Sequence, residues 1–298
     1  MQVKFWGVRG SIATPGHATK RYGGNTACTE LTLDDGNLII LDAGTGIRSL
    51  GEDLIKRGKS ISAYILITHP HWDHIQGFPF FRPAFIQGNV LRIAGPEAKD
   101  LKLREWVAGQ MDKVYFPVKL SELEATIDFV PLSENSFRAF DATVESIFVN
   151  HPGYTLGYRI SQGGKAIVYI SDNEPFSRES RHLFTNGVGE TIKLYENQIG
   201  DPNNRIVNFA KGADVLIHDS TYTPELYKAH IGWGHSDYLF ALKVAASAGV
   251  RKLCLFHYDP SLDDEKLDEI VDGCKNEMRK MGYSFELCAA KEGYKFKF

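Results

Sequence analysis

The sequence predicts an α/β protein, and three observations carry this prediction. Six short runs rich in Ile, Leu and Val have the length and the bounding turn residues of buried β-strands. Segments with apolar residues at helical spacing lie between and after these runs. No linker, low-complexity tract or short repeat interrupts the 298 residues. We therefore expect a single domain over residues 1–298.

Each predicted strand delivers a potential metal ligand or acid just past its last aliphatic residues. The runs are "NLIILDAG" with Asp42, "AYILITH" with His69, "ESIFVNH" with His151, "KAIVYISD" with Asp172, "DVLIHDS" with Asp219 and "KLCLFH" with His257. Sheets of α/β proteins bind ligands outside the carboxyl ends of their strands. The sequence therefore predicts one site, built from the entire chain, at a sheet edge.

Two helices are predicted in the last quarter of the chain. The first lies in "HSDYLFALKVAASAGV", with Ser236 as its N-cap and Gly249 as its end. The second lies in "SLDDEKLDEIVDGCKNEMRKMG", with Ser261 as its N-cap and Gly282 as its end. Acidic residues in its first turns and basic residues near its end match the helix dipole. The polar, turn-rich stretch 174–212 is predicted to form a flap beside the strand ends.

Composition and charge are those of a soluble globular enzyme, with 43% hydrophobic and 24% charged residues. Lys and Arg total 34 against 37 acidic residues, so the net charge of -3 indicates no nucleic-acid or anionic-membrane surface. The start "MQVKFWGVRGSIATPG" lacks the apolar core of a signal peptide, and no run reaches the roughly 18 apolar residues of a membrane span. We therefore expect a cytoplasmic protein with no membrane partner.

The four cysteines are scattered and have no CxxC spacing of a structural zinc site or a redox pair. They are Cys28, Cys254, Cys274 and Cys288. We expect reduced, buried thiols.

The stretch "AYILITHPHWDHIQG", residues 63–77, contains the densest group of potential ligands. Its apolar run ends in His69, His71, Asp73 and His74, four donors within six positions. An isolated histidine at a strand end is more often a hydrogen-bonded structural residue. Imidazole and carboxylate together are the ligands that zinc and its first-row neighbours accept, so the cluster favours metal binding.

Three further residues complete a site for two ions. His151 and His257 each follow an apolar run and can complete one ion each, while Asp172 can bridge both. The cofactors are therefore predicted to be two divalent ions, zinc first and manganese second.

The motif "HPHWDH" resembles the HxHxDH signature of the metallo-β-lactamase fold superfamily, and His151, Asp172 and His257 follow in the order that the superfamily uses. The resemblance implies an αββα sandwich of two mixed β-sheets with helices on the outer faces. It also implies that the first ion is held by His69, His71 and His151, and the second by Asp73, His74 and His257. Asp172 would lie between the ions, and Asp42 would steady the metal loop.

A second pair of motifs resembles the phosphodiesterase branch of this superfamily, which includes tRNase Z. In "DVLIHDSTYTPELY" and "GWGHSDYLF", Asp219 would hold the imidazole of His235, which could then protonate a leaving alkoxide. The predicted catalytic residues are therefore Asp73, His235 and Asp219. The alternative for His235 is a structural residue beside the helix cap. The opening "FWGVRGSIATPG" further resembles the group that contains phosphoribosyl cyclic phosphodiesterase.

The predicted reaction is hydrolysis of a small phosphodiester, of the cyclic nucleotide or cyclic sugar phosphate class, by a metal-bridging hydroxide. Only 21 positions separate His151 from Asp172 (172 minus 151), which leaves no room there for a tRNA-grasping arm. With the net charge of -3, this argues against a large nucleic acid as partner. A homodimer is left open.

Two other functions remain open. The first is hydrolysis of a thioester, a lactone or another carboxylic ester, which needs the same metals but no pair of Asp219 and His235. The second is a low-turnover metal-binding sensor or biosynthetic accessory protein.

Overall fold

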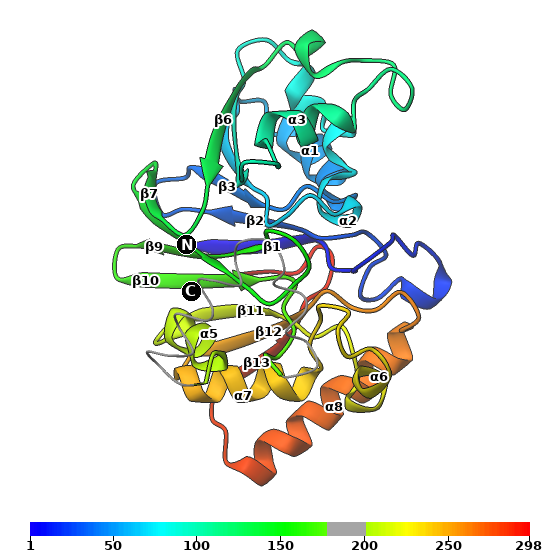
Figure 1. Ribbon diagram of the computed structural model, residues 1–298, viewed down its shortest axis with the longest axis vertical. Coiled ribbons are helices and arrows are strands. Elements are labelled where there is room, and N and C mark those ends of the chain that lie inside the picture. Colours follow the sequence, from blue (N-terminus) through cyan, green and yellow to red (C-terminus); the bar gives the residue numbers. More distant parts are fainter. Residues whose placement is uncertain (178–200) are drawn as a thin grey trace. The chain divides into compact units, whose positions relative to one another are not determined.

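The computed structural model describes residues 1–177 and 201–298, and these form two compact units. Unit 1 contains Met1–Ser133, Ala139–Asp141 and Lys291–Lys297, and unit 2 contains Glu134–Arg138, Ala142–Ala290 and Phe298. Within the described residues, each unit carries one mixed sheet of seven strands with helices packed on it (Figure 1). This architecture confirms the predicted α/β fold of two mixed sheets with helices.

The sheet of unit 1 is antiparallel on one side and parallel on the other. In spatial order its strands are β14 (Lys295–Lys297), β1 (Gln2–Gly7), β2 (Cys28–Thr32), β3 (Leu38–Leu41), β4 (Ser62–Leu66), β5 (Val90–Pro96) and β6 (Thr126–Leu132). The pairs from β14 to β3 are antiparallel, and those from β3 to β6 are parallel.

Helices of unit 1 cover this sheet and carry part of the metal loop. Helix α1 (Gly46–Lys56) packs on β1 and β2, and α3 (Leu103–Gly109) packs on β5 and β6. The short α2 (Trp72–Ile75) follows β4. Four 3-10 turns complete the described helical elements of the unit: η1 (His17–Thr19), η2 (Phe78–Phe80), η3 (Arg82–Phe85) and η4 (Leu120–Glu122).

The sheet of unit 2 also has a parallel part and an antiparallel part. In spatial order its strands are β13 (Glu286–Ala289), β12 (Lys252–Phe256), β11 (Val215–Asp219), β10 (Lys165–Ile170), β9 (Leu156–Gln162), β8 (Ala142–Phe148) and β7 (Ser136–Ala139). Strands β13 to β10 are mutually parallel, whereas β9 is antiparallel to both β10 and β8.

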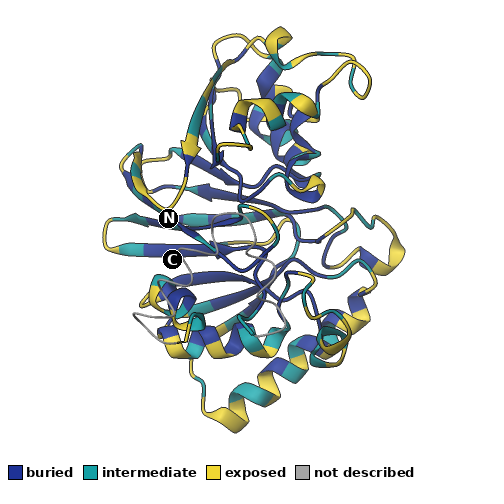
Figure 2. Cartoon of the chain, viewed as in Figure 1, coloured by how far each residue is buried: buried dark blue, intermediate teal, exposed yellow. Residues whose placement is uncertain are grey.

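Four described helices belong to unit 2, and α7 is the central one. They are α5 (Asn203–Ala210), α6 (Pro224–Ala229), α7 (Tyr238–Ala248) and α8 (Asp264–Met281). Helix α7 contacts β11, β12, α5 and α8. Helix α8 is buried on one side and exposed on the other, as the alternating colours of Figure 2 show, which agrees with its amphipathic sequence.

All six apolar runs that we expected to be strands are strands. In unit 1 the parallel neighbours β3 and β4 bring Asp42 and His69 to one edge. In unit 2 the parallel strands β10, β11 and β12 bring their following acids and histidine to one edge. Strand β8 runs in the same direction as β10 because both are antiparallel to β9, so His151 follows at that edge as well.

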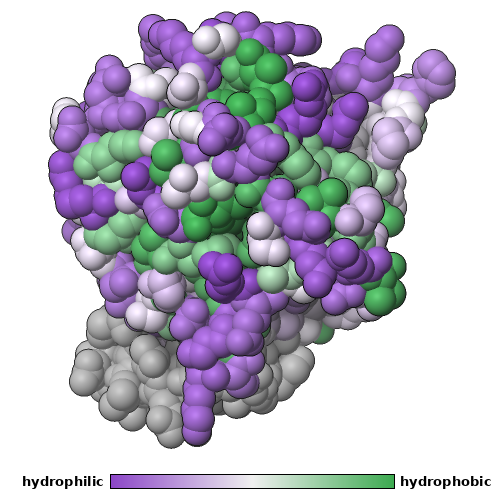
Figure 3. Space-filling model, turned by 90° about the horizontal axis from the view of Figure 1, so that it is seen from above, coloured by the Kyte–Doolittle hydropathy of each residue, from purple (hydrophilic) through white to green (hydrophobic). Residues whose placement is uncertain are grey.

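Burial explains why these strands form. Every residue of β3 and of β11 is buried, as expected for strands that are covered on both faces. In unit 1 the core includes residues of neighbouring parallel strands and of α1, among them Ile40, Ile65, Ile93, Ile47 and Leu50. The four cysteines are free and buried, as predicted. Some large apolar side chains stay exposed, and hydrophobic patches show among the hydrophilic side chains in Figure 3.

The predicted helix ends are correct, but the predicted N-caps are wrong by one and two residues. Helix α7 is capped by Asp237, whose carboxylate accepts from Phe240 N at 2.9 Å. Helix α8 is capped by Asp263, which accepts from Lys266 N at 2.7 Å. The two serines bond elsewhere: the Ser236 hydroxyl donates to a backbone carbonyl, and the Ser261 hydroxyl donates to Asp259.

The two predicted helix stops adopt the conformation that makes glycine suitable there. Gly249 has φ 62° and Gly282 has φ 68°, both in the left-handed region. The predicted flap 174–212 lies in part outside the described residues, which omit 178–200, and its described end contains α5. Among the described residues, no helix combines the length and the apolar character that crossing a membrane requires.

The cap of α8 gives a direct test of the helix boundary. Asp263→Ala should lower the free energy of unfolding by about 1 kcal/mol, because the N–H of Lys266 loses its acceptor. Asp263→Asn should be nearly neutral, since asparagine caps equally well. Urea denaturation of both variants measures the effect, with Ser261→Ala as the matched control. An equal or larger loss in the Ser261 variant would restore the cap that the sequence predicted.

Candidate metal centre

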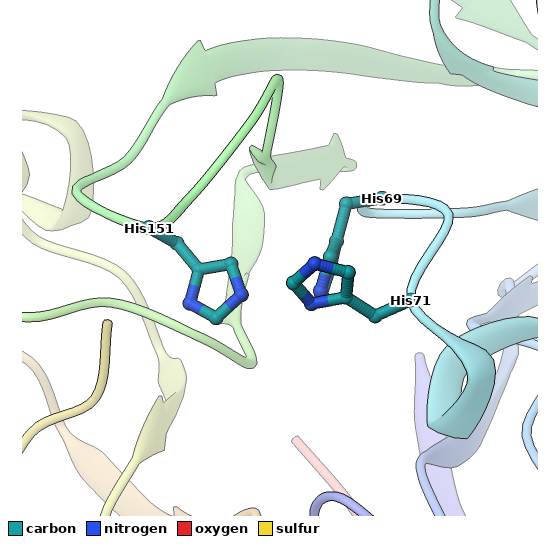
Figure 4. A group of neighbouring side chains, drawn as sticks. All are labelled: His69, His71 and His151. Atoms are coloured by element: carbon teal, nitrogen blue, oxygen red, sulfur yellow. The ribbon is translucent and has the colours of Figure 1, made fainter. Parts of the chain in front are cut away.

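The potential ligands of unit 1 lie on the loop between β4 and α2 and on α2 itself. His69 and His71 belong to the loop (Figure 4), and Asp73 and His74 belong to α2. The ring of His69 lies 4.3 Å, between centroids, from the rings of both His71 and His74. His69, Asp73 and His74 are buried, whereas His71 is exposed. The structure therefore gathers all four predicted donors of this loop.

Asp42 orients this loop, as the resemblance implied. Its Oδ1 atom accepts from Thr68 N at 2.8 Å, and its Oδ2 atom lies 2.8 Å from His74 Nδ1. This contact orients the ring of His74 with Nδ1 toward Asp42 and Nε2 toward Asp73, so Nε2 is the ring atom that could bind a metal. The Thr68 hydroxyl lies 3.0 Å from both Asp42 Oδ1 and His69 Nδ1.

The backbone of this loop packs against a glycine turn after β3. A Cβ atom on Gly44 would lie 2.2 Å from Asp73 O, and one on Gly77 would lie 2.0 Å from Gly44 O. The backbone N–H of Ala43 donates to His74 O at 2.7 Å. The glycines are therefore required for close packing under the metal loop. Sequence reasoning missed this role, although a Gly after a strand is a known signal of close backbone approach.

In unit 2, a backbone carbonyl orients the imidazole ring of His151. Its Nδ1 atom lies 2.7 Å from Gly234 O, and a carbonyl oxygen only accepts, so Nδ1 is the donor and Nε2 is the ring atom that could bind a metal. The residue stands on the loop after β8 (Figure 4). Gly234 has φ 89°, and a Cβ atom there would lie 2.4 Å from His151 Nδ1. Only glycine therefore fits at position 234.

The two oxygens of Asp172 face different imidazoles. Oδ2 lies 3.7 Å from His151 Nε2, and Oδ1 lies 3.5 Å from His257 Nε2. His257 has φ 63°, a left-handed backbone that is uncommon outside glycine. Its Nδ1 atom lies 3.1 Å from the Thr221 hydroxyl, which fixes the ring. Each oxygen of Asp172 thus has one imidazole Nε2 atom beside it.

His235 is held by Asp219, as predicted. The distance between His235 Nδ1 and Asp219 Oδ2 is 3.0 Å. Asp219 also accepts from Asn173 N at 2.9 Å, from Thr221 N at 2.9 Å and from the Thr221 hydroxyl at 2.7 Å. These contacts fix the carboxylate of Asp219, which in turn orients Nδ1 of His235 toward itself. The ring of His235 stacks on His257, with 5.0 Å between centroids.

Sequence reasoning missed the role of the buried acid Glu174 in unit 2. Its carboxylate accepts from Gly232 N at 2.7 Å, from Gly234 N at 2.8 Å and from the Tyr227 hydroxyl at 3.2 Å. Glu174 thereby fixes the loop that supplies the carbonyl for His151 and leads to His235. An acid two positions after Asp172 was the available signal.

The environment also excludes Tyr222 as a base. Burial, and then the negative charge of Asp219, raise the pKa of Tyr222 above its ordinary value. The phenol therefore keeps its proton at neutral pH. For the basic side chain of His218 burial acts in the other direction and lowers the pKa, so this residue stays neutral inside β11.

The spacing of the donor atoms tests whether the residues fit a metal. Two ligands about 2.1 Å from one tetrahedral ion lie about 3.4 Å apart. The His74 Nε2 to Asp73 Oδ2 distance in unit 1 is 3.3 Å, and the two distances from Asp172 in unit 2 are 3.5 and 3.7 Å. Together with imidazoles whose Nδ1 atoms already have hydrogen-bond partners, this spacing fits divalent first-row ions.

Two mixed sheets with imidazole and carboxylate donors after their parallel strands define a protein of the metallo-β-lactamase fold. The chain belongs to the beta-lactamase superfamily, because the model of the beta-lactamase superfamily domain matches residues 37–187, which contain the metal loop.

Relatives and solved structures agree with this assignment. A ribonuclease Z of Picrophilus torridus is 26% identical over 294 residues, which cover 89% of this chain and 88% of that protein. The metallo-beta-lactamase fold protein YhfI from Bacillus subtilis has a TM-score of 0.67 at 17% identity and covers 99% of both chains. The short form of human tRNase Z has a TM-score of 0.62 at 18% identity and covers 100% of this chain and 99% of that chain. These two structures share the fold.

The comparisons correct one prediction. The net charge and the short spacing argued against a large nucleic acid, but the relative with 26% identity is a ribonuclease. The argument was wrong because the net charge of -3 is a property of the whole chain and says nothing about a local surface. RNA therefore cannot be set aside as a substrate class.

The contact between His151 and Gly234 yields a prediction. Gly234→Ala should lower the divalent metal content at limiting metal, because the new Cβ atom displaces the imidazole ring of His151. Gly212→Ala is the matched control: it has φ 64° and no atom within 4 Å of the new Cβ, so it pays only the backbone strain of about 1 kcal/mol. Elemental analysis after dialysis compares the two variants. Equal metal content in both would contradict the assignment of His151 as a ligand.

Proposed function

We propose that the protein is a metal-dependent hydrolase that cleaves phosphodiester bonds. The observation that carries this proposal is the hydrogen-bonded pair of His235 and Asp219. The ring of His235 stacks on the candidate ligand His257. A phosphodiester with an alkoxide leaving group needs a proton donor, and this pair supplies one. The similarity to ribonuclease Z supports the same bond type.

The proposed cofactors are two divalent ions, with zinc first and manganese second. The proposed ligands are His69, His71 and His151 for one ion, Asp73, His74 and His257 for the other, and Asp172 for both. Support comes from the donor spacing within each unit and from membership in the superfamily. When bound, such ions activate water as a nucleophile and stabilise negative charge on phosphoryl oxygens.

The side chains of this protein would then position the groups and move the proton. Asp73 is proposed to act as ligand and catalytic residue, and its Oδ2 atom is held by Ser11 N at 2.7 Å. Protonated His235 gives its Nε2 proton to the leaving oxygen while its Nδ1–H stays bonded to Asp219. Asp219 itself is held in place by the three further hydrogen bonds that it accepts.

Two substrate classes follow from different observations. The similarity to ribonuclease Z favours an RNA phosphodiester. The short connection between His151 and Asp172 favours a small diester as the second candidate, because β9 and β10 form a direct antiparallel hairpin there. A panel that contains a tRNA precursor, a cyclic nucleotide, a cyclic sugar phosphate and a thioester separates these classes from each other and from a carboxylic ester hydrolase.

Metal and rate measurements separate ligands from the proton donor. Wild-type protein should contain close to two divalent ions per chain. His69→Ala and Asp172→Ala should each lose metal and activity, whereas His235→Ala should keep its metal and lose roughly a hundredfold in rate. Asp128→Ala, which changes an exposed aspartate of β6, is the control and should keep both. Loss of metal from the His235 variant would reassign this residue as a ligand.

The leaving group tests the reaction class. His235→Ala should slow a diester with an alkyl leaving group by roughly a hundredfold, and should hardly affect one that releases nitrophenolate, which departs without a proton. The measurement is the ratio of wild-type to variant rates on two diesters that differ only in this group. Equal ratios would count against the acid role and would favour a thioester or lactone hydrolase.

A further inference from the structure

The loop between α6 and α7 in unit 2 presents Trp233 to solvent in a fixed conformation. The side chain is 63% exposed. It is flanked by Gly232 and Gly234, which both have φ 89°, a conformation that favours glycine. The buried Glu174 carboxylate accepts the backbone N–H of both glycines, at 2.7 and 2.8 Å. A large apolar ring is thus exposed by a backbone that is tied down on either side of it.

An array of rings connects Trp233 with His235. Tyr222 stacks on His230, with 4.7 Å between centroids and 22° between planes. Trp233 meets His230 edge-on at 4.7 Å, and Tyr222 meets His235 edge-on at 5.9 Å. Edge-to-face contacts of this kind favour a defined ring orientation, and most of the Trp233 side chain stays exposed. The side chains of Tyr222, His230 and Trp233, here called the aromatic platform, therefore hold a defined geometry beside the proposed acid.

The position of Trp233 suits a substrate group next to the reacting phosphate. Two residues of extended chain span at most about 7 Å, so the backbones of Trp233 and His235 lie within that distance. A nucleoside attached to the phosphate has a comparable length. Nucleobases stack on exposed aromatic rings with little dependence on sequence, since every base has a π-face.

Resting on the proposed function, we propose that Trp233 binds the substrate by stacking on a nucleobase. The substrate class is then a phosphodiester that carries a nucleoside, as RNA and cyclic nucleotides do. A simple sugar or alkyl diester would lack this contact. Trp233 is thus a specificity-determining residue, and Glu174 acts on it only through the glycine backbone.

A matched pair of substrates isolates the contribution of the base. Thymidine 5′-(4-nitrophenyl phosphate) and methyl 4-nitrophenyl phosphate share one leaving group and differ in the nucleoside. Trp233→Ala should raise KM for the thymidine ester by about fivefold to a hundredfold, and should leave KM for the methyl ester and kcat for both within about twofold. Trp233→Phe should keep most of the affinity. Ile231→Ala changes the other exposed apolar residue of the loop and is the control.

The outcomes separate the platform from the proposed function. An equal rise of KM on both esters, or an unchanged KM for the thymidine ester, would overturn the stacking role. If the wild-type enzyme hydrolysed neither ester, the proposed function would fail instead. Calorimetric binding of thymidine 5′-monophosphate then tests the stacking role of Trp233 without turnover. Weaker binding by Trp233→Ala than by wild type and Ile231→Ala supports this role. Equal binding by all three proteins refutes it.

Discussion

Both units depend on a buried aspartate that holds an imidazole by its Nδ1 atom. In unit 1 Asp42 holds His74, and in unit 2 Asp219 holds His235. A buried carboxylate is costly unless it is well paired, and each one is satisfied by a threonine hydroxyl and a backbone N–H from its own unit. The hydrogen-bonded aspartate thereby sets the tautomer and the direction of the other ring nitrogen, on which ligand or acid chemistry depends.

Parallel strand pairing explains why both aspartates find such partners. In unit 1 Leu41 pairs with Leu66, so Asp42 stands beside the residues that lead to Thr68 and the metal loop. In unit 2 Ile170 pairs with His218, so Asp219 stands beside the segment after β10 and accepts the N–H of Asn173. The left-handed backbones of Asp42 and His257 then turn the chain sharply at the strand end. Strain at these two positions is offset by the hydrogen bonds that the turn makes possible.

These contacts mark the limit of what the sequence could predict. The strands and the donors after them are local features, because apolar runs and residue types are visible in a short window. Thr68, Glu174 and Gly234 act through partners that are close only after the strands pair and the loops fold. The predictions of the N-caps failed for a related reason. The Ser236 hydroxyl donates to a carbonyl that is distant in sequence, and Asp237 caps α7 instead. The prediction against a large nucleic acid failed because the net charge is summed over the whole chain and does not describe a local surface.

The division between strand ends and loops has a consequence for substrate choice. Residues at strand ends are fixed by pairing and by buried hydrogen bonds, so they suit the chemistry that a superfamily shares. In the loop that carries His235 and Trp233, Glu174 fixes the backbone on both sides of Trp233 through two glycine N–H groups, and Asp219 holds His235. Substitutions at the exposed position 233 disturb no buried contact of the ligands, whereas substitutions at Gly234 meet His151. If Trp233 binds substrate as proposed, substrate preference can change at the tip of this loop while its base continues to orient the proposed ligand His151 and the proposed acid His235.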